Sequence, residues 1–128
     1  MPNKIEITAE AHYRPGAKVR LNVDRSNVKA MFLDSGTRSS LTVMENTGGN
    51  YQELDSIFYS LADEHIPLED GKALVQIAWA KQGCRVLLLI NHQPLAVFDF
   101  KSRTGYSRLE AKWAQHPQQW RDDVLEAF

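Results

Sequence analysis

The residues whose types and spacing could do chemistry gather near the end of the most apolar stretch of the chain, Ala73 to Arg108. Asp99 lies between two phenylalanines, and the loop that follows it contains Arg103, Tyr106 and Arg108. An ionised carboxylate in an apolar strand is costly unless it is paired or hydrogen-bonded. A nearby guanidinium can supply two parallel hydrogen bonds to it. This group is therefore the first place to look for a site.

Two interpretations of Asp99 are open. In the structural one, which we favour, the carboxylate stabilises the turn from Lys101 to Tyr106 by accepting hydrogen bonds from backbone amides or from an arginine. In the other, a perturbed carboxylate lies in a pocket and acts as an acid, a base or a ligand anchor. We assign no catalytic residue. The candidate contacts with a ligand or partner are Asp99, Arg103, Tyr106 and Arg108.

The same loop interleaves arginine with tyrosine, a combination that can bind a phosphate or stack on a base. The whole chain, however, has 15 Lys and Arg against 16 Asp and Glu, a formal net charge of −1. Such a balance supplies no strong field for nucleic acid or for an anionic membrane surface. A hairpin edge protected by charges is the favoured interpretation, and neither a nucleic acid nor a membrane is expected as a partner.

The spacing of the histidine, cysteine and serine residues predicts neither a metal site nor a catalytic nucleophile. The four histidines are isolated from one another, at His12, His65, His92 and His116. The one cysteine, Cys84, has no companion at zinc-ligand spacing and is expected to be a core residue. Ser39-Ser40 lacks the glycine-flanked elbow of a hydrolase, and Gly48-Gly49 lacks the lysine of a phosphate loop. No metal and no cofactor is predicted.

Strands must position most of these residues, because apolar and polar side chains alternate along much of the chain. The alternation predicts strands over residues 4–10, 18–23, 28–34, 40–44, 75–79, 84–90 and 95–100. The last three, separated by short polar turns, form a predicted antiparallel meander in the C-terminal half. Counting by twos places Asp99 on the same face as Leu95 and Val97.

Two helices are predicted to pack on this sheet. The first begins at Asn50, where Glu53 completes a capping-box spacing, and its apolar stripe is Leu54, Ile57, Phe58 and Leu61. The second begins at His116-Pro117, and its apolar edge is Trp120, Val124 and Phe128. The predicted fold is a single α+β domain over residues 1–128: a mainly antiparallel sheet of about six to eight strands with two helices.

Composition and the N-terminal residues predict where in the cell the protein is located. The first ten residues lack the apolar core of a signal peptide, and the longest apolar run, Val86 to Ile90, is far too short to span a membrane. One cysteine is compatible with a reducing environment. We expect a cytoplasmic protein.

Two segments resemble a family of small uncharacterised bacterial proteins, a domain of unknown function. One is Phe32 to Thr37, similar to an acidic Phe-x-Asp-x-Gly-x turn. The more specific one combines Ile77 to Asn91 with Ala-Val-Phe-Asp-Phe at 96–100 and Gly-Tyr-Ser-Arg at 105–108. The resemblance covers roughly residues 31–113, with departures at Ser35 and Ser39-Ser40. It implies a bacterial origin and no particular activity, substrate or cofactor.

Taken together, these patterns favour a small cytosolic binding or interaction module without catalysis over an enzyme. One version is an inhibitor or immunity-type protein that blocks a partner through an exposed sheet face. The expected partner is another protein or a second copy of the chain. The alternative is a small-molecule or enzymatic site centred on Asp99 and the loop from Arg103 to Arg108.

Overall fold

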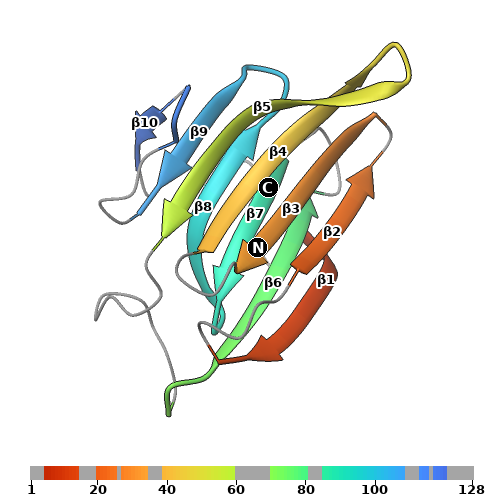
Figure 1. The fold of residues 1–128 in the computed structure, drawn as a ribbon. Coiled ribbons are helices and arrows are strands. Elements are labelled where there is room, and N and C mark those ends of the chain that lie inside the picture. The colour runs from red at the N-terminus through yellow and green to blue at the C-terminus, as the bar shows by residue number, and fades with distance from the viewer. Residues whose placement is uncertain are drawn as a thin grey trace.

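The computed structural model describes residues 5–14, 20–25, 27–34, 39–59, 70–80, 85–108, 113–115 and 117–120, which form two β-sheets (Figure 1). The larger sheet has the strand order β1 (Ile5–Tyr13), β6 (Ala73–Ala80), β7 (Arg85–Ile90), β8 (Gln93–Asp99), β9 (Thr104–Ser107) and β10 (Pro117–Gln119). The smaller has the order β2 (Arg20–Arg25), β3 (Val28–Asp34), β4 (Ser39–Thr47) and β5 (Asn50–Tyr59). The four strands of the smaller sheet lie in front of the larger sheet in Figure 1.

The core lies between the two sheets. Strand β3 shows the pattern that builds it: Val28, Ala30 and Phe32 are buried, while the residues between them are half-buried. Alternate side chains of a strand point to opposite faces, so one face of β3 meets the larger sheet and the other faces outward. The larger sheet contributes the inward side chains of its meander and the indole of Trp113. The two sheets thus form a β-sandwich.

The predicted α+β class is wrong, because the described residues contain no helix and the protein is all-β. The segment predicted as the first helix is strand β5, the edge strand beside β4. A β-bulge explains the misleading spacing: Val43 pairs with Asp55 and Met44 with Glu53, which leaves Leu54 as an extra residue. Leu54 and Ile57, three residues apart, consequently both contact the core, as they would on a helix.

The turn before β5 shows why Asn50 does not cap a helix. Thr47 pairs with Asn50, and Gly48 and Gly49 between them have φ angles of +69° and +96°. Two central residues with positive φ give the type I′ hairpin turn, which glycine adopts without strain. Asn50 therefore continues a hairpin instead of capping a helix.

The second predicted helix fails at its beginning. Pro117 to Gln119 form β10, which pairs in parallel with β9. A proline at the first position of an edge strand is well tolerated because no neighbour needs its missing N–H. The remaining apolar edge of the predicted helix, Val124 and Phe128, lies outside the described residues.

The strands that alternation predicted are present, with shifted ends, and the structure adds β5, β9 and β10 to them. Strands β6 to β9 pair antiparallel in chain order, as the predicted meander requires. The two extra strands at its end are too short for alternation to show, with four and three residues.

Candidate functional site

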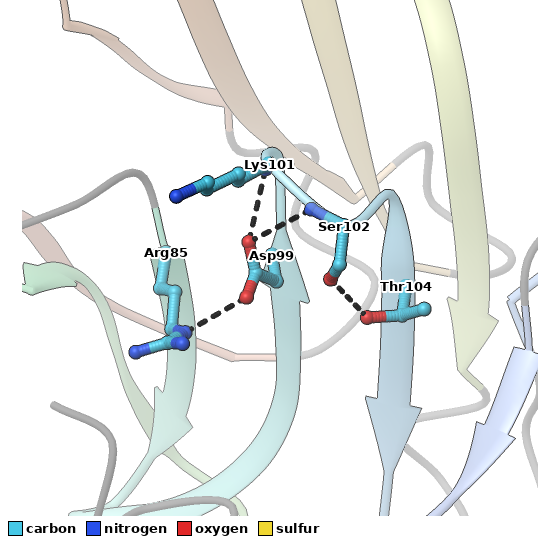
Figure 2. A network of polar contacts seen from close by, with 5 residues as sticks. All are labelled: Arg85, Asp99, Lys101, Ser102 and Thr104. Carbon is cyan, nitrogen blue, oxygen red and sulfur yellow. Dashed lines mark hydrogen bonds and ion pairs between the residues drawn. The ribbon is translucent and has the colours of Figure 1, made fainter.

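Asp99 ends β8 at the centre of a small polar network (Figure 2). One carboxylate oxygen, Oδ1, accepts hydrogen bonds from the backbone N–H groups of Lys101 (2.9 Å) and Ser102 (3.3 Å). The other, Oδ2, accepts one from Nε of Arg85 at 2.9 Å. The Asp99 side chain is 14% exposed. Both oxygens are thus engaged by donors of this chain.

The sheet register brings the charged partners together. Arg85 on β7 lies directly opposite Asp99, and Thr104 on β9 lies opposite it on the other side. An aspartate that accepts N–H groups two and three residues ahead forms a local turn, the role for which this residue type is favoured. The arginine of the favoured interpretation is therefore Arg85, from the neighbouring strand, while the candidate loop arginines have other partners.

Aromatic packing also stabilises the turn that follows Asp99. Phe100 is buried, with its ring centroid 5.8 Å from that of Trp79 and 5.2 Å from that of Phe98. On the polar side, the hydroxyls of Ser102 and Thr104 are 2.7 Å apart. A small molecule that binds to Asp99 would have to displace Arg85 or a backbone N–H group from a carboxylate oxygen.

The other candidate residues contact different parts of the molecule. Arg103 has a φ of +55°, and its Nη2 lies 3.1 Å from a carboxylate oxygen of Glu45 on β4, so it links the two sheets. Tyr106 packs against an apolar cluster on the outer face of the larger sheet. The guanidinium of Arg108 lies 5.7 Å from the Trp120 ring centroid. The four predicted residues thus make separate contacts, and the structure does not gather them around one point.

Counting by twos misplaced one neighbour of Asp99. Val97 is on the outer face with it, but Leu95 packs into the core between the sheets. The pairing jumps from Leu88–Ala96 to Leu89–Pro94, and this bulge at Leu95 reverses the alternation.

A second carboxylate, which the sequence analysis missed, joins the two sheets. Asp55 on β5 is fully buried, and its Oδ1 accepts the backbone N–H groups of Ser56 and Gln115, both at 2.8 Å. The neighbouring Ala114 donates its N–H to the carbonyl of Ser56 at 2.9 Å. These bonds attach the segment after β9 to the edge of the smaller sheet.

Trp113 forms the apolar part of the same attachment. Its indole is buried with its centroid 5.1 Å from that of Phe98, and Nε1 donates to the carbonyl of Tyr106 at 3.1 Å. A Cβ atom at Gly105 would overlap this ring, so the ring lies directly on the β9 backbone. Tyr59 adds a polar link, with its hydroxyl 3.3 Å from both the Leu95 carbonyl and the Ser107 hydroxyl.

We refer to these contacts as the β5–β9 closure, formed by Asp55, Tyr59, Gly105, Trp113 and Gln115. A signal for it existed in the sequence: an aspartate within an apolar strand needs a polar partner. Interpreting the segment as an amphipathic helix concealed this signal, because an aspartate on the polar side of a helix needs none.

Comparison with known proteins gives a family. Residues 13–128 match the family described as an uncharacterised protein conserved in bacteria, DUF2251. The chain belongs to this family. The resemblance noted from the two sequence segments is thereby confirmed. No curated protein and no solved structure matches this DUF2251 chain significantly.

The described part of this DUF2251 protein offers no metal centre, since no three or more histidine, cysteine, aspartate or glutamate side chains in it could hold an ion together. Cys84, His65 and His116 lie outside the described residues. A search of the described residues also finds no helix with the length and apolarity to cross a membrane.

The two sheets of the DUF2251 chain differ at their outer faces. On the larger sheet the central outward side chains are fully or almost fully buried: Ala78, Ala80, Leu87, Leu89 and Val97. On the smaller sheet, Phe58 is 43% exposed, and Met31, Leu33 and Met44 are only half-buried. We refer to the outward side chains of the smaller sheet as the β2–β5 outer face: Arg20, Asn22, Lys29, Met31, Leu33, Ser40, Thr42, Met44, Tyr51, Glu53, Ser56 and Phe58.

Proposed function

We propose that this chain is a non-catalytic protein-binding module that binds its partner through the β2–β5 outer face. The observation that carries the proposal is the group of four large apolar side chains that this face leaves half-buried or exposed, Met31, Leu33, Met44 and Phe58, with Phe58 the most exposed. Several large apolar side chains on one exposed face mark an interaction site more often than a single scattered residue does.

The composition of the face supports a protein as the partner. Methionine and aromatic residues are enriched in protein interfaces, and charged residues are depleted at their centres. Here Met31 and Thr42 lie near the centre, while Arg20 and Glu53 lie on the two edge strands. Lys29 also lies toward one end, with its Nζ 4.3 Å from the Tyr51 ring centroid. The uncharged central row, with charged residues on the edge strands and toward one end, suits a protein surface of mixed polar and apolar character.

Two carboxylates with engaged oxygens support a module without catalysis. Asp99 engages both oxygens with Arg85 and two backbone amides, and Asp55 engages two more amides at the β5–β9 closure. A general acid, base or nucleophile needs an accessible polar atom beside the reacting group. These two carboxylates serve the fold, and we assign binding to the β2–β5 outer face. An inhibitor or immunity-type protein that covers its partner with this face is one version of the proposal.

Site-specific photo-crosslinking in bacterial cells tests the proposal. A benzophenone side chain replaces Phe58 on the β2–β5 outer face and, as the control, the exposed His92 in the β7–β8 turn. We expect one discrete adduct from position 58, identifiable by peptide mass, and none from position 92. The adduct should disappear when Leu33→Glu adds a charge to the same face. Equal adduct patterns from both positions would contradict the proposal.

A further inference from the structure

We infer that the partner on the β2–β5 outer face is a second copy of this chain, related by a two-fold axis that runs parallel to the strands between β3 and β4. This inference rests on the proposed function and names its partner. A two-fold interface uses the same patch on both copies, so the patch must be complementary to itself. The smaller sheet satisfies this condition in its side-chain sizes.

The sizes are complementary in two of the three rows that cross the central strands. There the outward β3 residue is large, Leu33 or Met31, and its β4 partner is small, Ser40 or Thr42. In the third row, Lys29 pairs with Met44 and both are large. An axis between these strands lays β3 of one copy over β4 of the other. Each pair of large side chains then meets the two small ones of the other copy, and the reciprocal contact forms at the same time. Two stacked sheets pack best when their side chains interdigitate in this way.

The edge strands are complementary as well. Arg20 on β2 pairs with Leu33, and Phe58 on β5 pairs with Ser40, so both belong to one row across the sheet. The same axis brings β2 of one copy over β5 of the other and places the Arg20 guanidinium near the exposed Phe58 ring. A guanidinium on an aromatic face is a favourable contact that a dimer of this geometry makes twice.

The size of the face fits a reversible dimer. Four strands spaced at about 4.8 Å, over roughly seven residues of about 3.3 Å each, give a patch on the order of 450 Å² in projection. Two such patches bury roughly 900 Å² in total, below the size of stable interfaces and within the range of weak, transient ones. We therefore expect association that depends on concentration within the range of ordinary solution measurements.

Light scattering of the purified chain over about a hundredfold range of concentration tests the inference. The average mass should rise from 14.6 kDa toward twice that value. Phe58→Lys should raise the dissociation constant by about tenfold or more, because it removes the ring and places a like charge beside Arg20 of the other copy. Ile7→Lys is the matched control: Ile7 is 48% exposed against 43% for Phe58, but it lies on the larger sheet, and its substitution should leave the dissociation constant unchanged.

A size exchange tests the position of the axis. Ser40→Leu fills the small position opposite Leu33 of the other copy and should weaken the dimer by about tenfold or more. The double variant Leu33→Ser/Ser40→Leu exchanges large and small on both copies and should restore association. Circular dichroism and thermal unfolding confirm that each variant is folded. If Ser40→Leu does not fold, the comparison of Phe58→Lys with Ile7→Lys decides.

Three outcomes overturn the inference: a monomer at every concentration, equal weakening by Phe58→Lys and Ile7→Lys, or a folded Leu33→Ser/Ser40→Leu variant that stays monomeric. The photo-crosslinking experiment separates this failure from that of the proposed function. An adduct between position 58 and a different, identified protein would leave the β2–β5 outer face as a binding surface with another partner. An adduct with the mass of two chains supports both.

Discussion

Asp99 and Asp55 make the same kind of hydrogen bond, but their partners lie at different distances along the chain. Each accepts two backbone N–H groups through one carboxylate oxygen. The Asp99 amides belong to the next turn, and its third partner, Arg85, lies on the adjacent strand. Asp55 reaches Gln115, 60 residues away, and so joins the smaller sheet to the segment between β9 and β10 of the larger one. A local turn and a link between sheets thus use the same residue type.

The difference in burial should make the two carboxylates unequal in stability. Asp55 is fully buried, whereas Asp99 is 14% exposed at the side chain. Leaving a buried donor without its acceptor costs the full desolvation penalty, while a group near water recovers part of it. The β5–β9 closure should therefore contribute more to the free energy of unfolding than the Asp99 turn, and variants can test that order.

The largest effect is expected from Asp55→Ala. It removes the acceptor of the Ser56 and Gln115 amides, leaves a cavity in the core, and should lower the free energy of unfolding by about 3 kcal/mol. Denaturant unfolding at equilibrium measures this. Glu53→Ala, an exposed acid on the same strand, is the control and should cost less than about 0.5 kcal/mol. If Asp55→Ala lowers the free energy of unfolding no more than the control does, the hydrogen bonds of Asp55 do not stabilise the β5–β9 closure.

Gly105→Ala should have the next largest effect, at about 2 kcal/mol, because the added methyl group overlaps the indole of Trp113. A double-mutant cycle with Trp113→Leu, measured by denaturant unfolding, supplies the control. The smaller leucine leaves room for the methyl group, so the two costs should be non-additive by roughly 1 kcal/mol or more. Additive costs would mean that the alanine acts through the backbone alone.

Asp99→Asn should cost less, about 1 to 2 kcal/mol, because the amide oxygen still accepts the turn N–H groups, while the amide nitrogen, a donor, takes the place of the acceptor of Arg85 Nε and that one bond is lost. Arg85 is partly exposed, at 34% of its side chain, so water and salt screen the pair. Thermal unfolding at low and high salt measures the difference, which should shrink as salt increases. A loss as large as that of Asp55→Ala would reverse the proposed order of the two regions.

Tyr59→Phe tests the polar part of the closure and has a pH signature. Burial raises the pKa of the Tyr59 phenol above its ordinary value of 10.0. The neutral phenol therefore stabilises the fold fully below pH 10, and this contribution falls at higher pH, where the unfolded state loses the proton first. The variant should be about 1 kcal/mol less stable at neutral pH. Its deficit should shrink above pH 10 in denaturant titrations, while a constant deficit would contradict the buried phenol.

The comparison of the two carboxylates also shows which features a sequence can predict. Alternation located strands β1 to β4 and β6 to β8, and the contacts of Asp99 with the next turn agree with the favoured interpretation, because both features depend on neighbours along the chain. The partner of Asp55 lies across the sandwich, and nothing near residue 55 in the sequence indicates it. The bulge at Leu54 then gave β5 the spacing of a helix. A single inserted residue was therefore enough to hide both a strand and a buried carboxylate, and with them the all-β class.

A substitution in the turn between β7 and β8 should have the smallest effect on the free energy of unfolding. It tests how much the backbone conformation of a local turn contributes to stability. Asn91 and His92 have φ angles of +49° and +68°. Asn91 offsets this strain, since its side chain accepts the Leu74 N–H at 2.7 Å and donates to the Lys72 carbonyl at 3.2 Å. His92 is exposed in a conformation that favours glycine at this position of a type I′ turn.

His92→Gly should therefore raise the free energy of unfolding by about 0.5 kcal/mol, since the relief of strain exceeds the extra entropy of the unfolded glycine. Denaturant midpoints measured beside His92→Ala give the contrast, because alanine keeps the strained φ and should bring no gain. If His92→Gly is less stable than the natural chain, the histidine makes a stabilising contact. The turn would then contribute through side-chain bonding, as the Asp99 turn does, and not through backbone conformation.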